Sequence, residues 1–397
     1  MADTIAPRQW RHHIARATAL IGAALLAGCA TIVPKGPVEQ APPATTRPQP
    51  TRPGPVTGGI PEDTQRHRVA LLVPLTGPNG GVGRSIANAT QLALLDTRSE
   101  RVRITTYDTA LGAAAAAQRA IAEGNRLILG PLLADDVRAV APIARGAKVP
   151  VISYSNDVSV AGNGAYVLGY TPAQSIDRVV GYARTNGMTQ FAGLVPAGVY
   201  GQRASTSFLR AVEQAGGQVV SIQTYARGGI AAAVARLSRT SPYEAVLIAD
   251  QAGQAALAVP AIRKTTSRSA KVLGTELWNT ETGLGTMPAL NGAWYASVSN
   301  SLYRQFATKY RARFNAAPYR LSSLGYDSVL LTVRIARDWS LGRDFPESRL
   351  RAEDGFAGLD GAFRFGRDGV AERALEVQEV RAGGAVTVSP AARTFGE

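Results

Sequence analysis

Residues 69–75 read Val-Ala-Leu-Leu-Val-Pro-Leu, and residues 76–78 continue as Thr-Gly-Pro. The continuous apolar run is typical of a strand that is buried on both faces of a parallel sheet. The Gly/Pro loop ends this strand, and residues 85–95 then place apolar side chains at helical spacing. A strand, a tight loop and a helix in this order predict the first unit of an α/β protein.

The same alternation continues along most of the chain. After the first helix we expect strands at 101–107, 127–129 and 150–153, with helices at 113–123 and up to Arg145. A break is expected around 156–171, after which the pattern restarts. Further strands are predicted near 191–195, 218–225, 245–248, 272–273 and 294–298, and further helices at 201–215, 253–263 and 301–314. Two consecutive doubly wound parallel sheets predict two similar lobes with a cleft between them.

The N-terminal segment has the features of an export signal. Three arginines precede an apolar stretch, Ala17–Ala27, that is too short to span a bilayer. The stretch ends in Leu26-Ala27-Gly28-Cys29, which resembles the lipobox of bacterial lipoproteins. The resemblance implies a signal peptide at 1–28, a Cys29 that carries diacylglycerol and palmitate, and a membrane lipid anchor. Since Ala30 follows Cys29, it also implies the periplasmic face of the outer membrane; a plain signal peptide with an unmodified cysteine is the alternative.

Residues 29–65 have the composition of a tether. Nine prolines lie between Pro34 and Pro61, with almost no large apolar residues among them. Such a segment buries too little surface to offset its ordering entropy. In polyproline II geometry, at about 3.1 Å per residue, it would reach up to roughly 100 Å. A passive spacer remains the alternative.

Composition argues against most catalytic chemistry. The 397 residues contain one cysteine and three histidines, of which His12 and His13 lie in the expected signal peptide. His67 alone cannot supply a zinc site or a histidine inside a nucleophilic triad. We therefore expect no enzyme, no metal and no cofactor, with carboxylate-only chemistry as the remaining alternative. The net charge of +14 comes mainly from arginine, and an exported chain is not expected to bind nucleic acid.

Seven short motifs together resemble the type I periplasmic-binding-protein fold, the superfamily of leucine-binding protein. They occur in family order and cover nearly everything after the tether. They are Pro74–Pro78, Tyr107–Thr109, Gly130–Leu132, Val149–Ser153, Tyr200-Gly201, Gly325–Asp327 and the Phe/Gly pattern from Phe356 to Gly369. The resemblance implies one binding-protein domain at 66–397. Its N-lobe is expected at about 66–170 plus 318–342, and its C-lobe at about 171–317 plus 343–397, joined by a hinge.

Within that superfamily the chain is most similar to the penicillin-binding-protein activator (LppC-type) lipoproteins. The motifs that carry this narrower similarity are Leu72–Pro78, Tyr107–Thr109, Gly130–Leu133, Gly169–Pro172 and the lipobox. Large enteric members of that family have a helical-repeat domain where this chain has the Pro-rich tether. The similarity implies a peptidoglycan synthase, that is a penicillin-binding protein, as the partner.

Type I binding proteins hold their ligand where the two lobes face each other, at the carboxyl ends of strands. The corresponding residues here are Thr76, Leu132, Leu133, Ser153, Tyr154, Ser155, Tyr200, Glu276 and Trp278. Amino-acid-binding relatives hold the ligand's carboxylate with small hydroxyl residues after Gly-Pro, where this chain has leucines. Tyr200 is expected either to contact a ligand or to pack the wall, and Glu276 either to bind an ammonium group or to be solvated. Trp278 is expected to be an aromatic residue of the cleft.

These observations lead to one functional hypothesis with one alternative. We expect a non-enzymatic envelope lipoprotein that regulates a peptidoglycan synthase through protein contact or by sensing a ligand. The alternative is the substrate-binding lipoprotein of an ABC importer for amino acids, peptides or similar small polar solutes.

Overall fold

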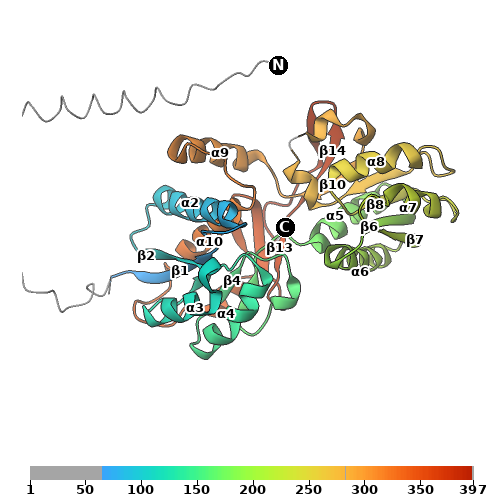
Figure 1. Cartoon of the computed structure of the whole chain (residues 1–397). Coiled ribbons are helices and arrows are strands. Elements are labelled where there is room, and N and C mark those ends of the chain that lie inside the picture. Colours follow the sequence, from blue (N-terminus) through green and yellow to red (C-terminus); the bar gives the residue numbers. More distant parts are fainter. Residues whose placement is uncertain (1–64, 282, 396–397) are drawn as a thin grey trace, which may run out of the picture. The chain divides into compact units, whose positions relative to one another are not determined.

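A computed structural model describes residues 65–281 and 283–395 of the chain (Figure 1). The strands of these residues form three sheets. Among the described residues, no helix combines the length and the apolar composition that a membrane span requires. The expected signal peptide, Cys29 and all but the last residue of the expected tether lie outside the described residues.

The first sheet is entirely parallel and has the strand order β2-β1-β3-β4-β5. Its apolar run at Val69–Val73 is fully buried, as a central strand covered on both faces should be. The fifth strand lies inside the break expected at 156–171. The strands are β1 (His67–Val73), β2 (Val102–Asp108), β3 (Ile128–Leu129), β4 (Val151–Ser153) and β5 (Ala165–Val167).

Alternate residues of β1 point to opposite faces of this sheet, and a different helix pair closes each face. The odd-numbered residues from 69 to 73 share a core cluster with α2 (Gly80–Thr97) and α10 (Ser322–Ile335). The even-numbered residues share another cluster with α3 (Ala113–Ala122) and α4 (Ala134–Gly146). The first sheet and these four helices form what we call the first lobe (Figure 1).

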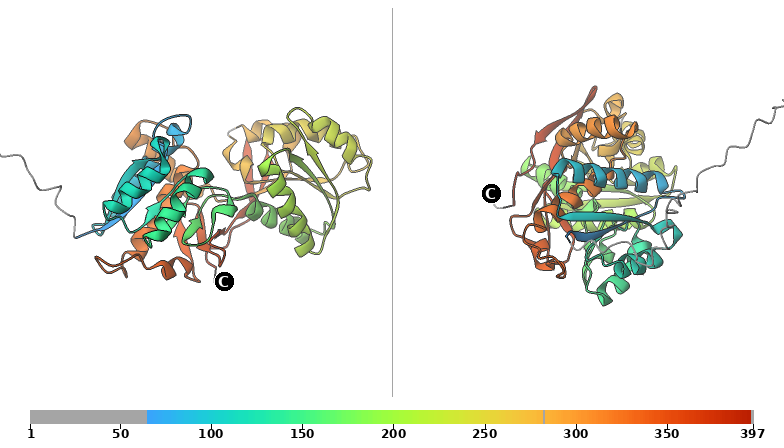
Figure 2. Two further views of the ribbon diagram at one scale, coloured as in Figure 1. Left: turned by 60° about the horizontal axis from the view of Figure 1, so that its bottom comes forward. Right: turned by 90° about the vertical axis from the view of Figure 1, so that its left-hand side faces the viewer.

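The second sheet has the order β15-β14-β10-β9-β8-β6-β7, in which β14 and β15 are antiparallel to their neighbours. One face packs against α5 (Pro172–Thr185) and α6 (Val199–Gln214), and the other against α7 (Ile230–Leu237) and α8 (Ala252–Ile262). This sheet and its helices form the second lobe (Figure 2). Its strands are β6 (Gln190–Pro196), β7 (Gln218–Tyr225), β8 (Ala245–Ile248), β9 (Lys271–Gly274), β10 (Trp294–Ser297), β14 (Glu376–Arg381) and β15 (Gly384–Ser389).

The packing of residues 343–373 differs from the expected lobe boundary, which placed them in the second lobe. The antiparallel sheet of β11 (Phe356–Gly358), β12 (Gly361–Phe365) and β13 (Ala371–Arg373) contributes its phenylalanines to the core of the first lobe. Helix α9 (Ser301–Phe314) likewise packs on α2 of the first lobe. The physical reason is burial: the phenylalanines of β11 and β12 share a core with α10, and the aromatic residues of α9 pack against α2. Within the described residues the chain therefore crosses between the lobes three times, after β5, after β10 and after β13.

The first strand–helix junction has the same geometry in both lobes. In the first lobe, Gly83 of α2 lies so close to the carbonyl oxygen of Pro74 that a Cβ atom would overlap it. In the second lobe, Gly201 of α6 has the same relationship to the carbonyl oxygen of Pro196. Each glycine lets its helix start directly on the end of the preceding strand. This close approach explains why α2 begins at Gly80, earlier than the Ser85 expected from apolar spacing.

Candidate functional site

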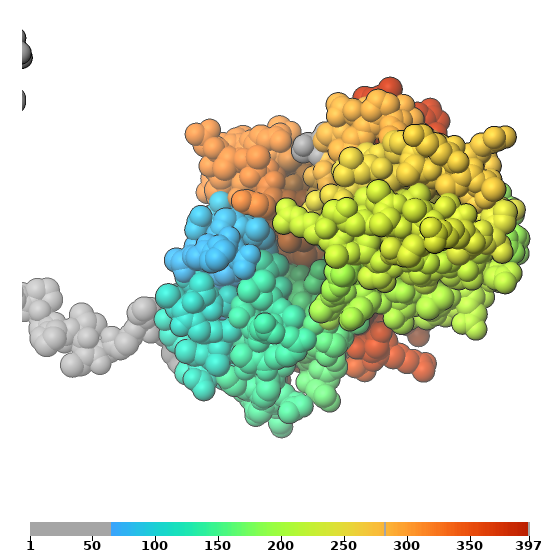
Figure 3. Space-filling view, turned by 45° about the vertical axis from the view of Figure 1, so that its right-hand side comes forward, coloured from blue at the N-terminus to red at the C-terminus, as the bar shows by residue number. Residues whose placement is uncertain are grey.

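The candidate site is a cleft between the lobes, which Figure 3 shows as a hollow. Its lining includes Asn156 and Val158, in the loop after β4, and Gln202 and Arg203, on α6. Asp157, in the loop after β4, forms an ion pair across it with Arg203 of α6, with 2.6 Å between oxygen and nitrogen. A second arginine, Arg138 of α4, lies 2.7 Å from the other oxygen of Asp157. The two lobes are thus joined at one edge of the cleft by a carboxylate shared between two guanidinium groups.

The polar groups at the carboxyl end of β1 form hydrogen bonds with neighbouring parts of the first lobe. Thr76 is exposed, and its hydroxyl donates to Asp108 Oδ2 at 2.9 Å. The other oxygen of Asp108 accepts the backbone amides of Leu75, at 2.8 Å, and Ala110, at 2.9 Å. Desolvation alone would raise the pKa of Asp108, but these amides outweigh it and lower the pKa. Thr76 and Asp108 therefore tie the loop after β1 to the carboxyl end of β2.

The turn after β3 offers no side-chain donors. It contains a cis peptide bond between Gly130 and Pro131. Leu132 is half-buried against the core of the first lobe, whereas Leu133 is exposed at the start of α4. A ligand carboxylate placed here could receive hydrogen bonds only from the backbone.

The hydroxyl groups after β4 are already used within the first lobe. Ser153 Oγ donates to the Pro131 carbonyl at 3.1 Å and accepts the amide of Ser155 at 3.0 Å. Ser155 Oγ accepts the amide of Asp157 at 3.1 Å. Tyr154 is buried, with its hydroxyl 2.8 Å from Ser328 Oγ of α10. These three residues are buried in the first lobe and leave few polar atoms free for a ligand.

On the second lobe, the structure brings two predicted residues, Tyr200 and Glu276, into contact. The Tyr200 hydroxyl lies 3.0 Å from Thr275 Oγ1 and donates to Glu276 Oε1 at 3.1 Å. Ser175 of α5 donates to the other oxygen of Glu276 at 2.5 Å. Burial raises the pKa of Glu276, and it also raises the pKa of Tyr200, which the neighbouring carboxyl group raises further. This four-residue group is a hydrogen-bonded wall of the cleft.

Trp278 lies in the core of the second lobe. Its side chain is fully buried, its Nε1 donates to the Asp250 carbonyl at 2.9 Å, and its ring contacts Tyr295. Trp294 is buried against Tyr182 with Lys271 over its ring. Neither indole group is free to stack on a ligand in this conformation.

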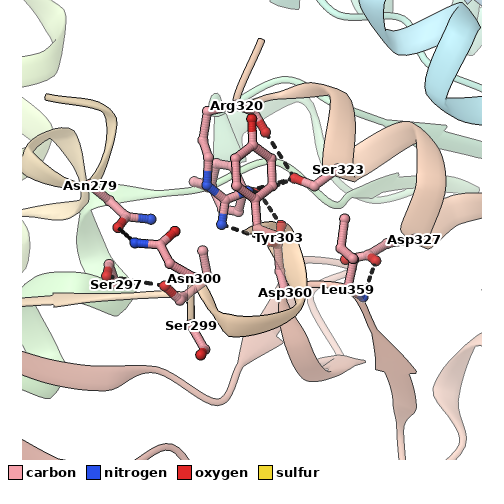
Figure 4. Close-up of polar contacts among 12 residues, drawn as sticks. Asn279, Ser297, Ser299, Asn300, Tyr303, Arg320, Ser323, Asp327, Leu359 and Asp360 are labelled. Carbon is pink, nitrogen blue, oxygen red and sulfur yellow. Dashed lines mark hydrogen bonds and ion pairs between the residues drawn. The ribbon is translucent and has the colours of Figure 1, made fainter. Parts of the chain in front are cut away.

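Sequence reasoning missed a buried charged network at the hinge (Figure 4). Arg320, in the turn before α10, donates to Asp360 Oδ1 at 2.7 Å and to Ser323 Oγ at 2.9 Å. Tyr170, at the first crossing between lobes, hydrogen-bonds to the other oxygen of Asp360. Burial would raise the pKa of Asp360, but the arginines hold it below its ordinary value. We call the set Tyr170, Arg320, Asp327, Asp360 and Arg373 the hinge network.

The second half of the hinge network is less completely paired. Arg373 Nη2 donates to the Leu168 carbonyl at 2.9 Å, while its Nη1 lies 3.6 Å from Asp327 Oδ2. Asp327 accepts the amide of Leu359 at 2.5 Å through its other oxygen, and burial followed by repulsion from Asp360 raises its pKa. Nε and Nη1 of Arg373 and Nε of Arg320 are buried without hydrogen-bond partners. Such orphaned donors cost free energy unless a water or a ligand satisfies them.

A small cavity connects the hinge network to the Glu276 wall. It is about 30 Å³, which by volume admits a water molecule but not an amino acid. Both lobes contribute to its lining, which includes Tyr170, Gln174, Ser175, Glu276, Arg320 and Arg373. Among the described residues, no cluster of histidine, cysteine or carboxylate side chains has the arrangement of a metal site. The chemistry that this geometry supports is hydrogen bonding and charge pairing, that is, binding.

The chain belongs to the periplasmic binding protein family, whose model matches residues 67–385. It is also 27% identical over 139 residues to an uncharacterized protein of Rickettsia prowazekii (strain Madrid E). That match covers 34% of this chain and 37% of the relative, so the similarity spans about a third of the curated relative.

Solved structures of two kinds share the fold. A Rhodospirillum rubrum structure with the provisional description of a branched-chain amino acid ABC transporter has a TM-score of 0.71 at 21% identity, over 81% of this chain and 100% of that one. The C-domain of LpoA from Haemophilus influenzae, a regulator of PBP1A, has a TM-score of 0.65 at 17% identity, over 81% of this chain and 99% of that one. Full-length LpoA has a TM-score of 0.65 at 18% identity, over 82% of this chain and 59% of that one. At these identities the similarity shows the fold, a two-lobed α/β binding protein of type I.

Proposed function

We propose that this protein is a non-enzymatic regulator of a peptidoglycan synthase, acting from the cell envelope through protein contact. The observation that carries the proposal is that the polar groups near the cleft form their hydrogen bonds within the protein. Ser153, Ser155 and Glu276 have their hydrogen bonds within the protein, and the cavity beside Glu276 holds little more than a water. A receptor for free amino acids would need these groups for its ligand.

The surface around the strand ends supports a protein partner. Leu111 after β2, Leu133 after β3 and Val199 after β6 are all exposed. They stand at the carboxyl ends of strands, where a solute receptor would need polar groups. Exposed apolar side chains on both lobes favour contact with another protein surface.

The proposal includes the anchoring predicted from the sequence. Acylation of Cys29 and a proline-rich segment would fix the domain to the outer membrane and let it reach a synthase across the periplasm. LpoA, a regulator of PBP1A, has this fold in its C-domain, and the sequence similarity to LppC-type lipoproteins points the same way.

Capture of penicillin-binding proteins from detergent-solubilised envelopes tests the proposal. The full chain should retain a penicillin-binding protein, and a Leu133→Asp, Val199→Asp double variant should lose it. Leu257→Asp is the control, because Leu257 is apolar and at least as exposed as Leu133 and Val199 but lies on α8, away from the strand ends. Repeated failure to recover any penicillin-binding protein would refute the proposed partner. An equal loss of captured protein with Leu257→Asp would refute the proposed contact surface at the strand ends.

A second function, solute receptor of an ABC importer, has one observation in its favour. Glu276 and Tyr200 lie together on the wall of the cleft, where an ammonium group could replace the Ser175 hydrogen bond. A thermal-shift screen of amino acids and muropeptides distinguishes the two functions. A ligand at about 100 times its Kd stabilises the folded state by about 2.7 kcal/mol, which is easily measured.

A further inference from the structure

Buried polar side chains occupy one face of the second sheet, where β10 and β14 lie beside each other. Tyr295 and Ser297 of β10 are in register with Gln378 and Glu376 of β14, so all four side chains share one face. The residues between them are apolar and pack with α5 and α6 on the opposite face. All four polar residues are buried, which a strand tolerates only when their polar groups have partners.

One oxygen atom of this polar row has no partner. The Tyr295 hydroxyl donates to Gln378 Oε1 at 2.6 Å, and Gln378 Nε2 donates to Ser297 Oγ at 3.2 Å and to Glu376 Oε1 at 2.8 Å. Oε2 of Glu376 accepts no hydrogen bond from the described residues, although only 8% of Glu376 is exposed. Unlike the orphaned atoms of the hinge network, this oxygen is not sealed off from the space beside it.

That space is a cavity of about 350 Å³, which is within the range of small-molecule sites. Its walls come from the second lobe and from the first turn of α9, and they include none of the residues that the sequence predicted for the cleft except the buried Trp278. Asn279 and Asn300, whose side chains are joined by a hydrogen bond of 2.6 Å, stand at its hinge side (Figure 4). Thr387 of β15, which is in register with Gln378, stands at the opposite side.

The charges of the cavity favour a cation. Its lining contains two carboxylates, Glu376 and Glu281, and one guanidinium group, that of Arg304. None of these three side chains forms an ion pair with a described residue, and Arg304 is exposed on α9. A nearly buried carboxylate without a counter-charge is costly, so a cation that contacts Glu376 would remove that cost. The lining is thus net negative in a chain whose net charge is +14.

We propose that this cavity binds a small hydroxylated amine of the amino-sugar class, with the ammonium group on Oε2 of Glu376. An ammonium group only donates hydrogen bonds and a carboxylate only accepts them, which makes the two complementary. The rest of the lining offers amides, hydroxyls and a guanidinium group, that is, both donors and acceptors. Hydroxyl groups suit such a mixed lining because each can donate and accept. The site rests neither on the proposed synthase contact nor on the cleft between the lobes.

The test is calorimetric titration of the purified full chain with glucosamine hydrochloride, with sodium chloride at equal ionic strength as the reference. At about pH 6 amines keep their proton. We expect saturable binding at one site, and we expect glucose and N-acetylglucosamine, which lack the ammonium group, to bind at least about tenfold more weakly. That factor corresponds to the loss of one charge-assisted hydrogen bond.

Glu376→Gln removes the charge but keeps a carbonyl oxygen that can accept from Gln378. This variant should weaken glucosamine binding by about tenfold or more. Glu213→Gln is the matched control, because it removes the same charge from an exposed position on α6, outside the cavity. It should bind glucosamine like the native protein.

A second pair of variants keeps the test decisive if Glu376→Gln fails to fold. Thr387→Trp places a bulky side chain at an exposed position in the wall of the cavity and should abolish glucosamine binding. Val386→Trp is its control, because Val386 is also exposed and precedes Thr387 on β15, so its side chain points to the other face of the strand. This control should bind glucosamine normally.

Three results would overturn the proposal. The first is the absence of saturable glucosamine binding. The second is glucosamine binding that survives Thr387→Trp, which would place the ligand elsewhere, such as in the cleft. The third is glucose binding as tight as glucosamine binding, which would show that no carboxylate recognises the ammonium group. None of these results bears on capture of a penicillin-binding protein, so the two proposals fail separately.

Discussion

Asp157 and Arg203 form an ion pair of 2.6 Å that links the loop after β4 in the first lobe to α6 in the second. The carboxylate of Asp157 is nearly buried and also accepts the hydroxyl of Ser159 at 2.6 Å. Burial alone would raise the pKa of Asp157, but the hydrogen bonds from Ser159 and Arg203 outweigh it and lower the pKa to about 2. The charged form of this carboxylate therefore stabilises the contact between the lobes.

We expect Asp157→Asn to lower the free energy of unfolding by about 2 kcal/mol at pH 7, because it removes charge-assisted hydrogen bonds from a nearly buried site. The folded pKa is below the unfolded value of about 3.9. The stabilisation is thus present above about pH 4 and is lost as the pH falls toward 2. Urea titrations of the native protein and of Asp157→Asn should show that the difference between their free energies of unfolding becomes smaller as the pH falls over this range.

Asp135→Asn is the matched control for that experiment. Asp135 contacts the same Arg138, at 2.7 Å, but its side chain is 94% exposed. An exposed ion pair contributes little, so this substitution should change the free energy of unfolding by less than about 1 kcal/mol. Equal losses in the two variants would contradict the interpretation.

The substitution Glu276→Gln should stabilise the protein at neutral pH, by on the order of 1 kcal/mol. Burial raises the pKa of Glu276 in the folded state, so ionisation at neutral pH costs stability. A glutamine carbonyl can still accept the Ser175 hydroxyl. The gain should disappear as the pH falls below the unfolded pKa of about 4.3, where both side chains are neutral. Midpoints of thermal unfolding at several pH values measure this gain in stability. A gain that persists at low pH would show that ionisation of the buried Glu276 is not its cause.

Gly358→Ala should destabilise the protein by about 2 kcal/mol, a typical cost of overpacking. A Cβ atom at Gly358 would lie 2.7 Å from the carboxyl atoms of Asp327, which is fully buried and cannot move aside. Gly253→Ala on α8 is the control, because nothing lies within 4 Å of a Cβ there. That helical substitution should be neutral or stabilising by up to about 1 kcal/mol. Chemical denaturation of both variants measures the change in the free energy of unfolding. A Gly358→Ala protein as stable as the native protein would mean that the hinge network rearranges readily.

Cys29→Ser should release the protein from the membrane without unfolding it, because the serine cannot be acylated. The variant is expected in the soluble fraction of a periplasmic extract, with the circular dichroism of the native domain. Fractionation against an outer-membrane marker measures this. A Cys29→Ser protein that remains in the membrane fraction would refute the predicted lipid anchor.

Local patterns in the sequence predicted most of the parallel sheets. The buried run at Val69–Val73 and its counterparts are short apolar segments between helices, and such segments depend mainly on their immediate neighbours. The family order of the motifs then indicated the two-lobed fold, which the family match and the structure confirm. The lobe membership of Phe356–Ala371 could not be predicted this way, because apolar alternation identifies strands without saying which core they cover.

The hinge network could not be predicted from the sequence for a different reason. Tyr170, Arg320 and Asp360 are far apart along the chain, and a single arginine or aspartate in a polar stretch is usually a solvated residue. Their pairing depends on the crossings after β5 and β13, which bring Leu168 and Arg373 together. The signal that could have found them is Asp327, a charged residue in a helix segment that is otherwise mostly small and apolar.

The three crossings between the lobes also set the order in which the lobes can be completed as the chain grows from its N-terminus. The first lobe lacks α10 and β11–β13 until residue 373 has been made, by which time all of the second lobe except β14 and β15 is already present. Completing each lobe therefore requires contacts over long sequence separations, which slow folding. Until then both lobes leave apolar surface uncovered, and such surface favours aggregation of the incomplete chain.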